Sequence, residues 1–151
     1  MINRIEWIDN IILGIINEVG SNDPYDIASY LGIEIKRDNE KQNPFLRNAN
    51  AIYIRDFNDK ELIVLRDDLM NEKFVLSHEL GHAILHTEII NAYNNPLYNS
   101  GKNEIEADYF AFNIMYPNIN ANDFMGYTRA QVANMLGVNE RCVEIVFNNE
   151  I

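Results

Sequence analysis

The spacing of apolar residues predicts two helices at the start of the chain. Over Ile2–Val19, apolar side chains recur every three or four positions, which predicts an amphipathic helix that ends at Gly20. Asp23 and Pro24 then open a shorter predicted helix, Tyr25–Leu31, since proline is readily accommodated in a first helical turn.

Three short apolar runs follow, and polar or turn-forming residues separate them. They lie at Ile33–Arg37, Ala51–Arg55 and Leu62–Leu65, with Pro44 inside the first separating stretch. Runs this short, bounded by turn residues, are typical of strands. We therefore predict a small antiparallel sheet of three strands with one face turned toward the core.

The second half of the chain is predicted to be helical. A helix over Asn71–Leu85, capped by its first residue, is apolar almost all round and is expected to be buried. The next helix covers about Lys102–Met115 and is stopped by Pro117. Thr128–Leu136 and Asn139–Phe147 complete the chain as a C-terminal helical pair.

Together these elements predict an α+β fold. A chain of 151 residues is long enough to bury a core, and 47% hydrophobic with 23% charged residues is an ordinary globular composition. We expect a single domain over residues 1–151, with its core at about residues 22–117 and a helical extension at residues 118–151.

Charge and cysteine content narrow the range of partners. The formal net charge of −11 repels phosphates and anionic membranes, so we expect neither direct nucleic-acid binding nor a membrane partner. The single cysteine, Cys142, excludes an intramolecular disulfide and a cysteine-based zinc ribbon. The N-terminus lacks a signal-peptide layout, and no apolar stretch approaches the roughly 20 residues of a membrane span. We therefore expect a protein of the reducing cytoplasm.

The residues with the clearest chemistry are His78-Glu79-Leu80-Gly81-His82, an H-E-x-x-H sequence inside the predicted buried helix. Residues four apart share a helical face, so His78 and His82 can bind one zinc ion together. Glu79 is rotated by one position and can take a proton from the attacking water, then deliver it to the leaving amine. The alternative, two hydrogen-bonded core histidines, would bury these polar groups at a high cost in free energy.

The third ligand is predicted from a stripe on the following helix, formed by Glu104, Ala107, Asp108 and Ala111. The two alanines allow close approach to another helix, and the surface around Gly81 is the expected docking place. Glu104 can then complete the site, and Asp108 can accept a hydrogen bond from the other nitrogen of a ligand histidine. The expected cofactor is one zinc ion per chain, with manganese and iron as alternatives.

Three other side chains are also candidates for a metal ligand. Glu88 occupies the position at which one class of zinc peptidases has a third histidine, so that spacing fails. Glu106 points about 200° away from Glu104 around the helix, and the small-residue stripe favours Glu104. His86, four residues beyond His82, is interpreted as a helix-end or pocket-wall histidine, and its contribution to the site is left open.

A donor for the oxyanion that develops during peptide hydrolysis is also expected near the site. Tyr93, Tyr98 and His86 all lie close to the loop that follows the H-E-x-x-H helix. The sequence does not rank these three candidates.

Three segments of the chain resemble the ImmA/IrrE family of metallopeptidases. They are Phe74–His86 (FVLSHELGHAILH), Glu104–Ala111 (EIEADYFA) and Ile114–Pro117 (IMYP). Tyr116 stands where the family pattern usually has methionine. The resemblance covers most of Tyr25–Val146, and it implies a minimal zincin-like fold in which a small sheet and further helices pack on the H-E-x-x-H helix.

Carried over by position, the resemblance implies His78, His82 and Glu104 as zinc ligands. Glu79 is then the general base and acid, and Asp108 orients a ligand. The resemblance also implies a substrate, a helix-turn-helix transcriptional repressor of a mobile element. The expected function is therefore a zinc-dependent endopeptidase that cleaves such a repressor.

Two interpretations from other classes are kept beside this one. Gln131–Val146 has a helix-turn-helix-like layout, which would suit a DNA-binding protein. Its second helix, however, carries Glu140 and Glu144 against the single base Arg141, so we favour a packing or substrate-docking pair. The chain could also bind zinc and a regulator without catalysis, but a pure binding module has no need for Glu79.

Overall fold

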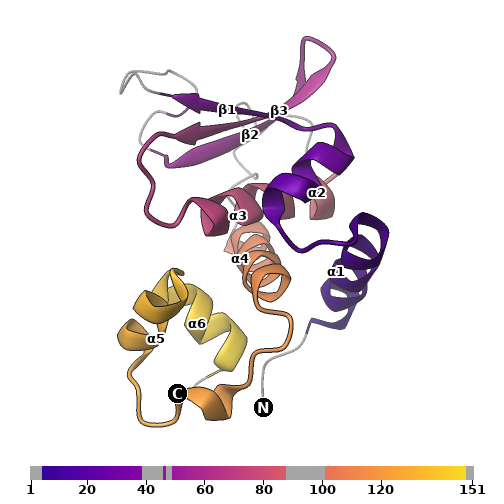
Figure 1. Cartoon of the computed structure of the whole chain (residues 1–151). Helices are drawn as coiled ribbons and strands as arrows, with labels where there is room; N and C mark the ends of the chain where they lie inside the picture. The colour runs from indigo at the N-terminus through magenta and orange to yellow at the C-terminus, as the bar shows by residue number, and fades with distance from the viewer. Residues whose placement is uncertain (1–4, 39–45, 47–48, 88–100, 149–151) are drawn as a thin grey trace.

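A small sheet lies over α2 and α3, with α4 beneath α3 and the C-terminal helices beyond it (Figure 1). The computed structural model describes residues 5–38, 46, 49–87 and 101–148. Its elements are, in chain order, α1 (Glu6–Val19), α2 (Pro24–Leu31), β1 (Glu34–Asp38), β2 (Ala51–Phe57), β3 (Lys60–Arg66), α3 (Glu72–Leu85), α4 (Gly101–Met115), the 3-10 helix η1 (Ala121–Phe124), α5 (Arg129–Leu136) and α6 (Glu140–Phe147). The predicted α+β class is confirmed. No helix among these described residues is long and apolar enough to cross a membrane.

The sheet has the strand order β1-β3-β2 and is mixed. β2 and β3 form an antiparallel hairpin whose turn residues, Asn58 and Asp59, both have positive φ (53° and 62°), as a tight two-residue hairpin turn requires. β1 instead runs parallel to β3, with Ile35 opposite Ile63. The prediction of an entirely antiparallel sheet is therefore wrong for β1.

The central place of β3 explains why the strands do not pair in chain order. All four residues of Leu62–Leu65 are buried. Alternate residues join the main core on the side of α3, while Leu62 and Val64 form a second cluster with Leu46 on the other face. A strand that is apolar on both faces is best placed at the centre of a sheet, so β1 and β2 occupy the two edges.

The helix ends agree with the predicted ones except at the start of α1 and in one cap. α1 begins at Glu6, after a non-helical Ile5 (φ −112°, ψ 87°), so the predicted helix from Ile2 is too long at Ile5, and Ile2 itself lies outside the described residues. α2 carries Pro24 in its first turn, as expected. Asn71 occupies the N-cap position of α3 but makes no side-chain cap hydrogen bond, so its predicted role as a cap is wrong. Its backbone (φ −111°, ψ 40°) is not in the extended conformation that directs a cap side chain at the first N–H groups.

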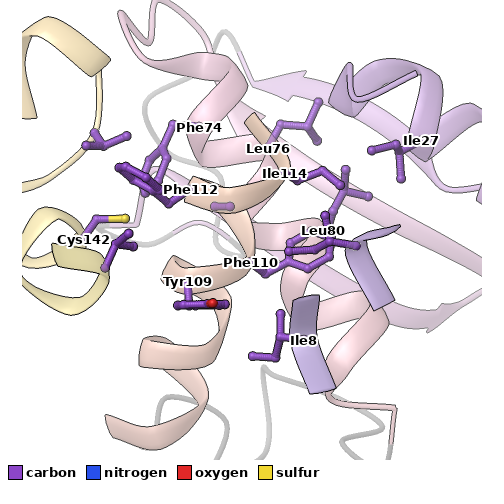
Figure 2. Packing of buried hydrophobic residues seen from close by; sticks show 14 of the residues in the cluster. Ile8, Ile27, Phe74, Leu76, Leu80, Tyr109, Phe110, Phe112, Ile114 and Cys142 are labelled. Atoms are coloured by element: carbon purple, nitrogen blue, oxygen red, sulfur yellow. The ribbon is translucent and has the colours of Figure 1, made fainter. Parts of the chain in front are cut away.

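The C-terminal pair forms as predicted and packs against α4. Thr128 and Gln131 make a capping box at the start of α5. Cys142 of α6 lies in the core with the aromatic side chains of α4 (Figure 2). Tyr116, directly after α4, donates its hydroxyl to the backbone oxygen of Leu136 at 2.5 Å. This hydrogen bond gives the tyrosine a structural role that methionine could not fill.

α3 and α4 cross in the middle of the core at small residues. Gly81 lies so close to α4 that a Cβ on it would be 3.2 Å from both Ala107 Cα and Phe110 Cδ1. Ala107 and Ala111 are fully buried, and Figure 2 shows Leu80 of α3 beside Phe110 of α4. The predicted docking of the alanine stripe on the surface around Gly81 is confirmed at Ala107.

The crossing predicts opposite effects of two glycine substitutions. Alanine normally stabilises a helix interior by about 1 kcal/mol relative to glycine, and we expect this gain for Gly14→Ala in α1, where no atom lies within 4 Å of the new Cβ. Gly81→Ala should instead lower the free energy of unfolding, and Gly81→Val should lower it further, by about 1–3 kcal/mol. Urea denaturation of the three variants in one buffer measures these changes. A stabilising Gly81→Ala would show that α4 moves aside freely.

Cys142 provides a second prediction. Its side chain is fully buried, and its Sγ lies 3.4 Å from the backbone oxygen of Asp108. Burial, together with the charge of Asp108, raises the pKa of the thiol well above its ordinary value. Because the thiolate is the reactive form, a thiol reagent should leave the folded protein unmodified and label one site after denaturation. Rapid labelling of the folded protein would contradict this packing of α6.

Candidate metal centre

α3 places both histidines of the H-E-x-x-H sequence on one face. His78 and His82 are one helical turn apart, so their rings point to the same side. Their Nε2 atoms lie 3.1 Å from each other. His82 is almost completely buried, whereas the side chain of His78 keeps 15% of its exposure. The two imidazole nitrogens therefore meet at one point that solvent reaches from the side of His78.

α4 brings a carboxylate to the same point. Glu104 Oε2 lies 3.2 Å from His78 Nε2, and its Oε1 lies 3.1 Å from His82 Nε2. These three residues form a group whose ligand atoms could hold one metal ion. A tetrahedral zinc with nitrogen and oxygen ligands at about 2.0–2.1 Å spaces those ligand atoms about 3.3 Å apart. The spacing and the donor set of the cluster thus fit zinc.

The electrostatics of the cluster also favour a cation. Burial by itself lowers the pKa of His78, but hydrogen bonds to Asp108 and Glu104 outweigh it and raise that pKa to about 10. Burial likewise raises the pKa of Glu104, but hydrogen bonds from His78 and His82 outweigh it and leave the pKa well below its ordinary value. When no metal is bound, the His78 imidazole therefore keeps a proton, which balances the negative charge of the Glu104 carboxylate.

Asp108 lies where the helical stripe predicted it. Its Oδ1 is 2.8 Å from His78 Nδ1, the nitrogen that faces away from Glu104. Its Oδ2 lies 4.0 Å from Nε of Arg141 on α6. A carboxylate in this place orients the imidazole ring and keeps the proton on Nδ1, which leaves Nε2 free to bind a metal.

Glu79 lies next to the cluster without belonging to it. Its side chain lines the same cleft as His78 and Glu104 but is not part of the three-residue group. Burial raises the pKa of its carboxyl group, while the two imidazoles and a backbone hydrogen bond from Tyr53 act in the opposite direction. Its raised pKa makes this carboxylate a better acceptor for a proton from water than an ordinary glutamate.

His86 and Glu106, which were not favoured as metal ligands, form a second polar layer on the Nδ1 side of His82. His86 Nδ1 lies 2.9 Å from His82 Nδ1, and His86 Nε2 lies 2.9 Å from Glu106 Oε2. Neither residue belongs to the group around Glu104. The spacing of four residues between His82 and His86 was visible in the sequence, but its significance depends on the carboxylate from α4. Burial lowers the pKa of His86, with Glu106 acting against this.

The cluster opens into a cleft of about 560 Å³. Ala51 and Ile52 of β2 line one part of it, and Asn139 and Arg141 at the start of α6 line another. Of the side chains proposed as oxyanion donors, Tyr93 and Tyr98 lie outside the described residues. The third, His86, uses both ring nitrogens in the contacts behind His82.

Comparison with known proteins gives the chain a family. Residues 28–143 match the model of the IrrE N-terminal-like domain, peptidase family M78. The chain is 28% identical over 129 residues to "Uncharacterized immunity region protein 2" of Bacillus phage phi105, covering 82% of this chain and 78% of the relative. It is 27% identical over 134 residues to "Metallopeptidase ImmA" of Bacillus subtilis (strain 168), covering 84% of this chain and 76% of the relative. Because the matched residues include the whole cleft, the chain belongs to the IrrE N-terminal-like family of metallopeptidases.

Proposed function

We propose that this protein is a zinc-dependent endopeptidase that cleaves a helix-turn-helix repressor. His78, His82 and Glu104 hold one zinc ion per chain, and Glu79 acts as general base and acid. The observation that carries the proposal is the convergence of two imidazole nitrogens and one carboxylate, with contacts of 3.1–3.2 Å, from two helices that cross at Gly81. Two nitrogens and one carboxylate with an open side are the donor set of catalytic zinc in peptidases.

Bound zinc supplies a Lewis acid that polarises a carbonyl and lowers the pKa of water to about 7. The residues of the chain supply the remaining chemistry. The Glu79 carboxylate takes a proton from the attacking water and later donates it to the leaving amine. Asp108 keeps the His78 ring in place through the contact at 2.8 Å. The mostly buried surroundings of His82 and Glu79 exclude other water from the reacting atoms.

The position of β2 supports a peptide as the substrate. β2 is an edge strand of the described sheet, since β3 is its neighbour on one side. Its residues Ala51 and Ile52 line the cleft, and Tyr53 hydrogen-bonds to Glu79. An extended peptide that adds to the edge of a sheet uses backbone hydrogen bonds, which are independent of its sequence. A substrate backbone along β2 would lie directly beside the Glu79 carboxylate.

The choice of a repressor as substrate rests on the relatives and on charge. One relative is an immunity region protein of a bacteriophage, and another is the metallopeptidase ImmA. A net charge of −11 favours association with a basic DNA-binding protein through complementary potentials. The same charge disfavours the alternative in which α5 and α6 bind DNA. Arg141, the base in the would-be recognition helix, lines the cleft beside Asn139.

The substitution Glu79→Gln separates catalysis from metal binding. The variant should bind one zinc ion per chain, like the wild type, because Glu79 is not a ligand. It should cleave helix-turn-helix repressors of the same genomic region at least about 100-fold more slowly, since the general base is lost. Metal analysis and gel-based cleavage assays measure the two properties. Glu18→Gln, an exposed change of the same kind on α1, is the matched control.

The other outcomes discriminate between the alternatives. If neither protein retains zinc, the proposed ligands are wrong and the histidines serve only the core. If both retain zinc and neither cleaves a repressor, either the substrate is a different protein or the domain is a zinc-stabilised module that binds a regulator.

A further inference from the structure

We propose that His86 and Glu106 are a positioning pair that fixes the tautomer and the ring orientation of His82 for metal binding. The inference rests on the proposed function, because it takes His82 as a zinc ligand. It assigns a role to a buried imidazole–carboxylate contact that the hydrolytic mechanism does not use.

The pair forms a continuous chain of hydrogen bonds behind the ligand. His82 Nδ1 contacts His86 Nδ1 at 2.9 Å, and His86 Nε2 contacts Glu106 Oε2 at 2.9 Å. All three side chains are buried, with exposed fractions of 1%, 8% and 9%. Because these groups are buried, water cannot replace a hydrogen-bond partner that is lost. Breaking either contact would therefore cost free energy, and the pair holds the His82 ring in one orientation.

The directions of these hydrogen bonds determine which nitrogen of each imidazole ring carries the proton. A carboxylate only accepts hydrogen bonds, so His86 must carry its proton on Nε2 to donate to Glu106. The Nδ1 of a neutral His86 is then an acceptor, and the contact with His82 requires a proton on His82 Nδ1. With its proton on Nδ1, His82 would bind a metal through Nε2, the atom that lies 3.1 Å from Glu104 Oε1. This series of hydrogen bonds thus selects the His82 tautomer with its proton on Nδ1, which can bind a metal through Nε2.

The geometry of the helix crossing explains why His82 needs an intermediate residue. Asp108 of α4 reaches His78 directly at 2.8 Å. Glu106 of the same helix contacts His86, which follows the last residue of α3. The backbone N–H of His86 also donates to the oxygen of His82 at 3.1 Å, which holds the two residues together. The second imidazole therefore connects His82 to a carboxylate of α4, as Asp108 does for His78 without an intermediate.

Loss of the pair should weaken zinc binding without touching the ligands or Glu79. We expect His86→Phe and Glu106→Leu to lower zinc affinity about 10- to 100-fold, the usual effect of removing a residue that orients a metal ligand. His86→Gln keeps an acceptor oxygen for His82 Nδ1 and should recover part of the affinity, which lost packing alone would not predict. Lys102→Met is the control, since the exposed Lys102 pairs with Glu106 at 3.8 Å only from the solvent side.

Two measurements on the full chain test the inference. Competition with a chromophoric chelator gives the zinc affinity, with the urea midpoint of each metal-free variant as the check on folding. Nitrogen NMR of the zinc-loaded wild type gives the tautomers without any substitution. The expected spectrum has the proton of His86 on Nε2 and the proton of His82 on Nδ1.

The possible outcomes separate this inference from the proposed function. Unchanged affinity in folded His86→Phe, or a proton on Nδ1 of His86 in the wild type, overturns the positioning role while leaving the zinc site intact. A wild type that binds no zinc overturns both. Weakened affinity with partial recovery in His86→Gln supports the pair, and so does the expected tautomer if a variant fails to fold.

Discussion

The close crossing of α3 and α4 at Gly81 and Ala107 is the constraint on which the site depends. A Cβ at position 81 would lie only 3.2 Å from the backbone of α4, so a glycine allows the two helix axes to approach. This approach lets the short side chain of Asp108 reach His78 and lets Glu104 reach both histidines. With larger residues at the crossing, the carboxylates of α4 would stand too far from the imidazoles of α3.

The same crossing creates an electrostatic difficulty that polar pairing resolves. Imidazoles and carboxylates lie beside an apolar core that contains Leu80 and Phe110. Buried charge is tolerated only when it is paired or bound to a metal. Each histidine nitrogen of the cluster has a polar neighbour within 3.2 Å. These contacts keep the side chains in place, and the point where His78, His82 and Glu104 meet suits a cation.

The contribution of sequence patterns can be judged from particular residues. The sequence predicted that His78, Glu79 and His82 lie together, because their spacing in one helix decides their geometry. It also predicted that Glu104 and Asp108 approach them, because alanines on the same face indicated a helix contact. The contact between His86 and Glu106 was not predicted, because His86 lies beyond the last residue of α3 and Glu106 lies off the alanine stripe. The place of β1 was also missed, since strand order depends on which strand is buried on both faces.

The sequence by itself thus determined what periodicity and local spacing control: the helices and strands, the H-E-x-x-H pentapeptide on one helical face and the stripe opposite it. The tertiary structure alone decided how these pieces meet. It placed β1 parallel to β3, connected His82 through His86 to Glu106, and turned Arg141 of α6 toward the cleft. The physical reason is that helix and strand geometry follows from neighbouring residues, whereas contacts between elements depend on the packing of the whole core.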